Sequence, residues 1–172
     1  MEQCMKFEIF PLEKLSMDGS SLFLGMTQAE TEKIIGTGKF IGGRSYYFDS
    51  ELAVSYDSAG KVDFIEFLGG IDGRLKPIIY GVSAFDTDAD ELYELLMQHN
   101  GDDIDTERGY SYSFLKLSVG IYREALPEDV AEMAEEASSL GTPMSDGEIE
   151  YETKKARHWA TIGFGVRDYY RN

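Results

Sequence analysis

The sequence is poor in the residues that build disulfides and metal sites. It has one cysteine, Cys4, two histidines and four prolines in 172 residues. A single cysteine excludes an intramolecular disulfide, and two separated histidines leave no His/Cys cluster for a metal. No stretch approaches the roughly 20 apolar residues that cross a bilayer. Residues 1–7 lack a basic segment followed by an apolar one, so we expect no secretory signal. We therefore expect a cytoplasmic protein without membrane association. We also expect no cofactor.

Positive charge is scarce as well, and the carboxylates are concentrated. Sixteen lysines and arginines face 32 acidic residues, which gives a formal net charge of −16. Residues 86–107 contain nine carboxylates and residues 124–152 contain ten, without one lysine or arginine in either segment. Such a surface repels nucleic acid and attracts a basic partner. Acidity also promotes solubility by itself, so both explanations stay open.

The remaining composition predicts one folded domain spanning residues 1–172. Hydrophobic residues make up 42% of the chain and aromatic residues 13%, which supplies a core. Alternating and apolar patterns predict strands, and spaced leucines and alanines predict helices. The predicted strands are 6–10, 44–48, 51–56, 61–68, 74–83, 109–124 and 158–170, and the predicted helices are 28–35, 86–99, 127–140 and 148–157.

The order of these elements predicts an α+β fold, in which short helices pack on an antiparallel sheet. The first helix has a capping box formed by Thr27 and Glu30, and Gly36 ends it. A helix followed by strands then occurs again after residue 84. The order therefore suggests two tandem helix-plus-sheet repeats, residues 1–83 and 84–172, with a helical insertion in the second.

Two passages resemble known bacterial families. The sequence LGMT at 24–27, a short helix, and the hairpin DSAGKV at 57–62 are similar to a repeat of beta-lactamase inhibitor proteins and small outer-membrane assembly lipoproteins. Residues 118–124, the acidic insertion and residues 155–170 resemble the C-terminal half of immunity proteins encoded beside polymorphic or contact-dependent toxins. The second resemblance implies a protein that binds a toxin domain and blocks it without chemistry of its own.

Motifs for catalysis or ligand binding are incomplete. Asp86, Asp88 and Asp90 resemble the start of a calcium loop, but Glu91 stands where the turn needs glycine, so we interpret the three acids as a helix start. Glycines 36, 38, 42 and 43 follow a helix, whereas a phosphate loop opens one. The two histidines belong to no nucleophile motif. We therefore expect no enzyme and no metal site.

The candidate site is a partner-binding surface of acids and aromatic residues. Tyr and Trp are enriched in interface hot spots, although aromatic residues at strand spacing, such as those at 110, 112 and 114, also pack in cores. The leading hypothesis is an immunity protein whose carboxylates occlude a basic toxin such as a nuclease. The alternative is a binding or assembly module of the inhibitor-like fold with another partner. The residues selected are Asp102, Asp103, Asp105, Glu132, Glu135, Glu136, Tyr110 and Trp159.

Overall fold

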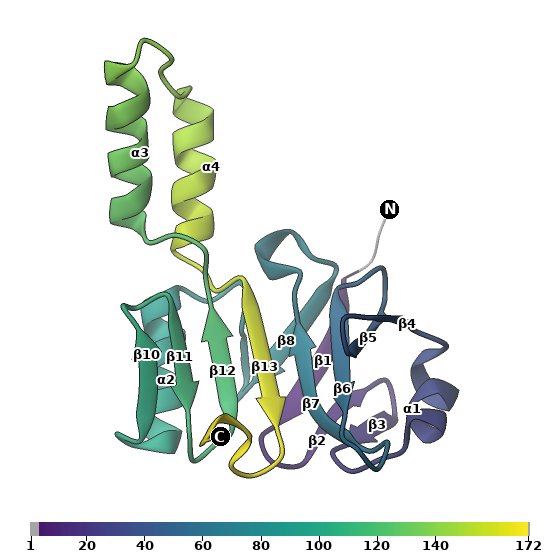
Figure 1. Cartoon of the computed structure of the whole chain (residues 1–172). Coiled ribbons are helices and arrows are strands. Elements are labelled where there is room, and N and C mark those ends of the chain that lie inside the picture. Colours follow the sequence, from purple (N-terminus) through teal and green to yellow (C-terminus); the bar gives the residue numbers. More distant parts are fainter. Residues whose placement is uncertain (1–3, 172) are drawn as a thin grey trace.

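The computed structural model describes residues 4–171 and confirms the α+β fold. A five-stranded sheet has the order β3-β2-β1-β8-β9, in which only β1 and β8 pair in parallel (Figure 1). Its strands are β1 (Met5–Phe10), β2 (Lys14–Met17), β3 (Ser20–Phe23), β8 (Leu75–Ile79) and β9 (Val82–Ser83).

An antiparallel eight-stranded sheet forms the larger layer. Its order is β10-β11-β12-β13-β7-β6-β5-β4, so β7 and β13 meet at its centre. Its strands are β4 (Lys39–Ile41), β5 (Arg44–Tyr47), β6 (Leu52–Tyr56), β7 (Val62–Phe67), β10 (Ile104–Glu107), β11 (Ser111–Phe114), β12 (Val119–Tyr122) and β13 (Thr161–Gly165). Four strands that follow α1 (Gln28–Ile35) make one half, and four that follow α2 (Ala89–Asn100) make the other. The tandem repeat itself stays a prediction.

One face of the large sheet is buried against both α2 and the small sheet. Phe7 of β1 meets Phe67 of β7 edge-on, with ring centroids 5.5 Å apart. At the other end, Tyr93 of α2 lies over Phe114 of β11, at 6.1 Å. These contacts belong to one continuous hydrophobic core. Burial of this apolar area is the main stabilising contribution to the fold. The opposite face, which we call the outer face, points toward the viewer in Figure 1.

The predicted capping box forms at the start of α1. The Glu30 amide donates to Thr27 Oγ1 at 3.2 Å, and the Thr27 amide donates to Glu30 Oε1 at 3.1 Å. The helix ends at Gly36, whose φ of 87° lies in the region that favours glycine. Local chemistry alone therefore determines both ends of this helix.

Several predicted strands are shorter or divided. Residues 109–124 form two strands, β11 and β12, joined by a turn in which Ser118 has a φ of 52°. Residues 74–83 likewise divide into β8 and β9, and only 161–165 of the range 158–170 is a strand. A short 3-10 helix, η2 (Tyr169–Arg171), follows β13, and another, η1 (Gly70–Asp72), follows β7. No sequence pattern predicted the strands β2, β3, β4 and β10.

The predicted helical insertion is a hairpin of α3 (Pro127–Ser139) and α4 (Asp146–Ala156) between β12 and β13. It projects away from both sheets as a separate arm (Figure 1). The apolar spacing that predicted α3 buries Val130, whereas Met133 of the same spacing is 52% exposed. Only Val130 and Ala156 are buried in the two helices. We call residues 127–156 the acidic arm.

Candidate partner-binding surface

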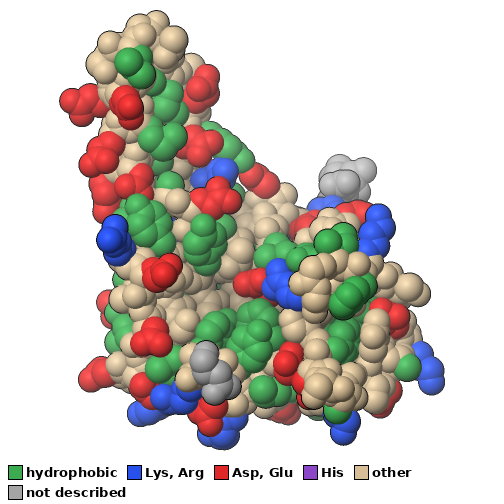
Figure 2. Space-filling view, viewed as in Figure 1, with side chains coloured by type: hydrophobic (Ala, Val, Ile, Leu, Met, Phe, Trp, Pro, Cys, Tyr) green, Lys and Arg blue, Asp and Glu red, His purple; other side chains and the backbone are tan. Residues whose placement is uncertain are grey.

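The acidic arm carries an almost unneutralised negative charge. Its residues include nine carboxylates and two lysines, Lys154 and Lys155. Among residues 4–171 the arm makes one ion pair, between Lys155 and Glu152 at 4.0 Å, which is at the limit for such a contact. Exposed pairs of this kind contribute little. The arm therefore presents most of its carboxylates directly to solvent, as the red atoms in Figure 2 show.

Exposed apolar side chains accompany this charge. Met133 is 52% exposed, and Leu140, seven residues further along, is 72% exposed. Residues seven apart lie on one side of a helix, and Glu136 lies between them on the same side. An apolar and acidic strip of this kind suits a partner that offers both apolar and basic groups.

Two tyrosine hydroxyls attach the arm to the body of the protein. The Tyr110 hydroxyl donates to Asp129 at 2.5 Å, and the Leu126 amide donates to the same carboxylate at 2.8 Å. These two hydrogen bonds hold the pKa of Asp129 below its usual range, and the first of them raises the pKa of Tyr110. On the other helix, the Tyr151 hydroxyl donates to Asp72 in η1. Tyr110 and Asp72, which both lie outside the arm, thereby orient α3 and α4 respectively.

Arg123 lies beneath the arm and is almost completely buried. Its Nη1 donates to the Ala156 carbonyl at the end of α4, at 3.0 Å, where a positive charge is favourable. Its guanidinium lies 4.6 Å from the centre of the Trp159 ring. No sequence motif marked Arg123, which is one of three basic residues between the two acidic segments.

The predicted acids fall into two separate groups. Glu132, Glu135 and Glu136 are exposed on α3. Asp102 and Asp105 are exposed at the β10 edge of the large sheet. Ile104 at the start of β10 pairs with Phe114 at the end of β11. At the other end of these strands, Glu107 pairs with Ser111, and Ser111 pairs with Tyr122. The arm follows Tyr122, whereas residues 102 and 103 precede Ile104, so the two groups lie at opposite ends of these strands.

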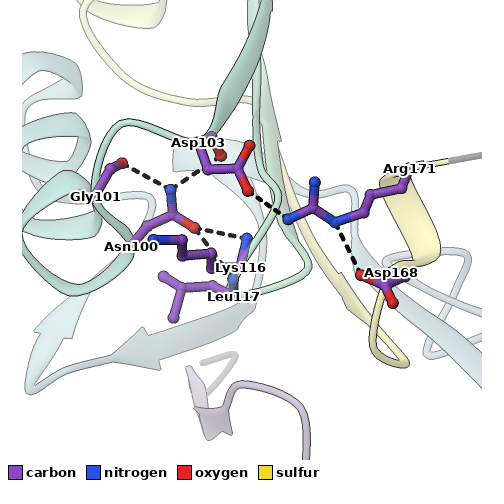
Figure 3. A network of polar contacts seen from close by, with 7 residues as sticks. All are labelled: Asn100, Gly101, Asp103, Lys116, Leu117, Asp168 and Arg171. Carbon is purple, nitrogen blue, oxygen red and sulfur yellow. Dashed lines mark hydrogen bonds and ion pairs between the residues drawn. The ribbon is translucent and has the colours of Figure 1, made fainter.

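Asp103 has a structural role rather than a free carboxylate (Figure 3). It pairs with Arg171, which also donates to Asp168 at 2.9 Å. Its carbonyl accepts from the side chain of the buried Asn100 at 3.1 Å. Asn100 Oδ1 in turn accepts from the amides of Lys116 and Leu117, at 2.9 and 3.1 Å. This network fixes the α2–β10 loop against the turn between β11 and β12.

The prediction that Trp159 belongs to an exposed binding surface is wrong. Trp159 is 1% exposed, and its indole Nε1 donates to the Ala89 carbonyl at 2.9 Å. Burial is favourable here because the large ring finds a hydrogen-bond partner for its only polar atom. Tyr110 is half-buried and uses its hydroxyl to orient the arm.

Aromatic residues near residue 171 cover part of the outer face. Tyr169 stacks on Phe64 at 4.5 Å, and Tyr170 packs against Phe64 edge-on. Gly120 and Gly163 lie underneath, where a Cβ would overlap the Tyr170 and Phe64 side chains respectively. Burial raises the pKa of the Tyr170 hydroxyl. This part of the outer face is a packed surface and not an open groove.

Within residues 4–171, no group of three or more His, Cys, Asp or Glu residues is arranged to hold a metal ion. No helix in the same range has the length and hydrophobicity needed to span a membrane. No protein-family model, curated protein or solved structure matches this chain. Function is therefore inferred from the surface of the molecule.

Proposed function

We propose that this chain is a cytoplasmic immunity protein that binds a basic toxin domain and blocks it. The acidic arm is the observation that supports this proposal most directly. It extends nine carboxylates away from the core on two helices that make few contacts with the sheets. Glu132, Glu135 and Glu136 are the proposed contacts, with Met133 and Leu140 as their apolar neighbours.

Inhibition would occur by occlusion. A nuclease holds substrate phosphates with lysine and arginine side chains, and carboxylates on the arm would occupy those positions. Close charge pairs across an interface reach coupling energies of about 1.5–7 kcal/mol and accelerate association at low salt. Catalysis by the chain itself has no part in this mechanism.

Co-expression tests the proposal. The chain is produced together with the C-terminal domain of the protein encoded immediately upstream, and growth is measured alongside pull-down at low and high salt. We expect rescue of growth and a complex that weakens as salt rises. The triple variant E132Q/E135Q/E136Q should lose both effects.

A charge-matched control removes three exposed acids elsewhere, in the variant E8Q/E91Q/E94Q. It has the same net charge as the arm variant and should retain rescue. Equal losses in the two variants would show that net charge and not the arm determines binding. Absence of both rescue and complex would contradict the proposal.

The second candidate is a binding or assembly module whose partner is not a toxin. Strand β4 favours it, since it lies at a sheet edge with Phe40 73% and Ile41 60% exposed. Such an edge can pair with another strand. A complex insensitive to salt, retained by the arm variant and lost in F40S/I41S, would support this candidate instead.

A further inference from the structure

A cavity of about 560 Å³ lies at the base of the acidic arm, between the start of α2, the β10–β11 turn and the start of α3. Three arginines, Arg108, Arg123 and Arg157, line it together with Ala89 and Gly109. Three acidic residues also line the cavity, so its lining is formally neutral in a chain of net charge −16. It belongs to neither the exposed strip of α3 nor the outer face.

Arg123 has a donor that the protein leaves unused. The residue is only 9% exposed. Its Nη1 and Nε donate to the carbonyls of Ala156 and Gly109, at 3.0 and 3.4 Å, whereas Nη2 makes no hydrogen bond within residues 4–171. No carboxylate in that range pairs with the guanidinium either. Nη2 is not among the buried polar atoms that lack a partner in that range, so it keeps contact with solvent and is free to donate to a ligand.

The start of α2 faces the same cavity. Asp88, Ala89 and Asp90 line it, and they are the N-cap and first two residues of a twelve-residue helix. The amino end of a helix carries partial positive charge and attracts anions. Arg108 and Arg157 add exposed guanidinium groups at the rim.

Three carboxylates oppose this attraction. Asp88 accepts the Asp90 amide at 3.0 Å and is thus occupied as the helix cap. Asp90 and Glu128 are exposed at the rim. None of the three forms an ion pair with the arginines of the cavity. Arg123 is therefore the one buried arginine of the cavity, whereas its mouth carries exposed charges of both signs.

We infer that this cavity binds a small oxyanion, a phosphate or carboxylate group, with Arg123 at its floor and Arg108 and Arg157 at its rim. The planar guanidinium of arginine suits both groups, since it donates parallel hydrogen bonds to two oxygens. The bound anion would accept a hydrogen bond from the free Nη2 of Arg123. This site is independent of the toxin-binding proposal.

The single tryptophan reports on the site. The Trp159 indole lies against Arg123 and donates to Ala89 at the start of α2, so its one indole NMR signal senses the cavity. Sodium phosphate and sodium acetate are each titrated into the full chain at constant ionic strength. We expect a saturable shift of the indole signal. Saturation by phosphate alone would identify a phosphate group as the ligand, and saturation by both would identify any oxyanion.

Variants at the rim leave the buried Arg123 unchanged. Removing rim arginines and removing rim carboxylates should change the affinity for the anion in opposite directions. R108Q/R157Q should weaken binding about tenfold or more, because a hydrogen bond to a charged group contributes about 1.5–3 kcal/mol. D90N/E128Q should strengthen binding by removing repulsion. A signal that never saturates with either anion, or saturation equal in all three proteins, would overturn the inference.

Discussion

Asn100 shows how one buried amide can organise a loop. Its side chain donates to the carbonyls of Gly101 and Asp103, and its oxygen accepts two amides from the turn between β11 and β12 (Figure 3). All hydrogen-bonding positions of its carboxamide are thereby used at a site that is 3% exposed. No other side chain of similar size offers two donors and an acceptor in this arrangement.

Replacing Asn100 should therefore destabilise the protein. N100A leaves the amides of Lys116 and Leu117 without partners, and we expect a loss of about 1–3 kcal/mol in the free energy of unfolding. Urea denaturation measures the change. The control Q98A removes an exposed amide from the same helix and should have little effect. Equal stability of N100A and the native chain would show that water replaces the side chain.

Gly120 should not tolerate even a methyl group. A Cβ there would overlap the Tyr170 hydroxyl, so G120A must displace the aromatic cover of the outer face. Overpacking of this kind costs about 1–3 kcal/mol. Thermal unfolding should show that Y170A partly suppresses the effect of G120A. The control G147A, in α4 where there is space for a methyl group, should be neutral or stabilising. Strict additivity of G120A and Y170A would contradict the proposed contact.

At the scale of elements, the acidic arm depends on its base. A two-helix hairpin with two buried side chains is too small to be stable alone, so its orientation depends on the hydrogen bonds of Asp129 and Asp72. The Asp129 carboxylate accepts these bonds best when ionised. Because its pKa is lowered in the folded protein, its contribution is present above the unfolded value of about 3.9 and is lost as pH falls through the folded value.

Removing the Tyr110 hydroxyl should raise the pKa of Asp129 toward its ordinary value. In an acid titration followed by NMR, the Leu126 amide signal of Y110F should change at a higher pH than that of the native chain. The exposed Tyr122 provides a control, and Y122F should leave the midpoint unchanged. An unchanged or lower midpoint in Y110F would show that the Leu126 amide alone determines the pKa.

Elements with local signals were predictable from the sequence. The capping box at Thr27 and the glycine at 36 gave both ends of α1, and Pro127 gave the start of α3. The division of 109–124 was not predictable, because the turn at Leu115–Ser118 contains neither glycine nor proline. Strand β4 has three residues and no buried side chain, so it has no hydrophobic period.

The candidate site was predictable only in part. Charge along the chain identified the exposed acids of α3, since long acidic helices rarely pack inside a protein. Exposure of an individual side chain depends on tertiary contacts, which bury Trp159 and pair Asp103 with Arg171. Arg123 has importance only because the β10–β11 turn, the end of α4 and Trp159 converge on it, which no single segment of sequence reveals.

For the whole molecule, a net charge of −16 produces repulsion that opposes compaction. Salt screens this repulsion, with a Debye length falling from about 10 Å at 0.1 M to about 3 Å at 1 M. We therefore expect the melting temperature to rise by a few degrees between 0.05 and 0.5 M NaCl. The rise should be smaller in E132Q/E135Q/E136Q. A melting temperature that falls with NaCl would show that attractive ion pairs outweigh the repulsion.

The pairing of β7 with β13 at the centre of the large sheet has a consequence for biosynthesis. About a hundred residues separate these partners in the chain, so β7 leaves the ribosome long before β13 exists. At about 5–20 residues per second, the edge of β7 that pairs with β13 stays unpaired for roughly 5–20 seconds. During that interval the nascent chain has an open strand edge, which invites pairing with other chains. Chaperone demand during translation should therefore be greatest between the emergence of β7 and that of β13.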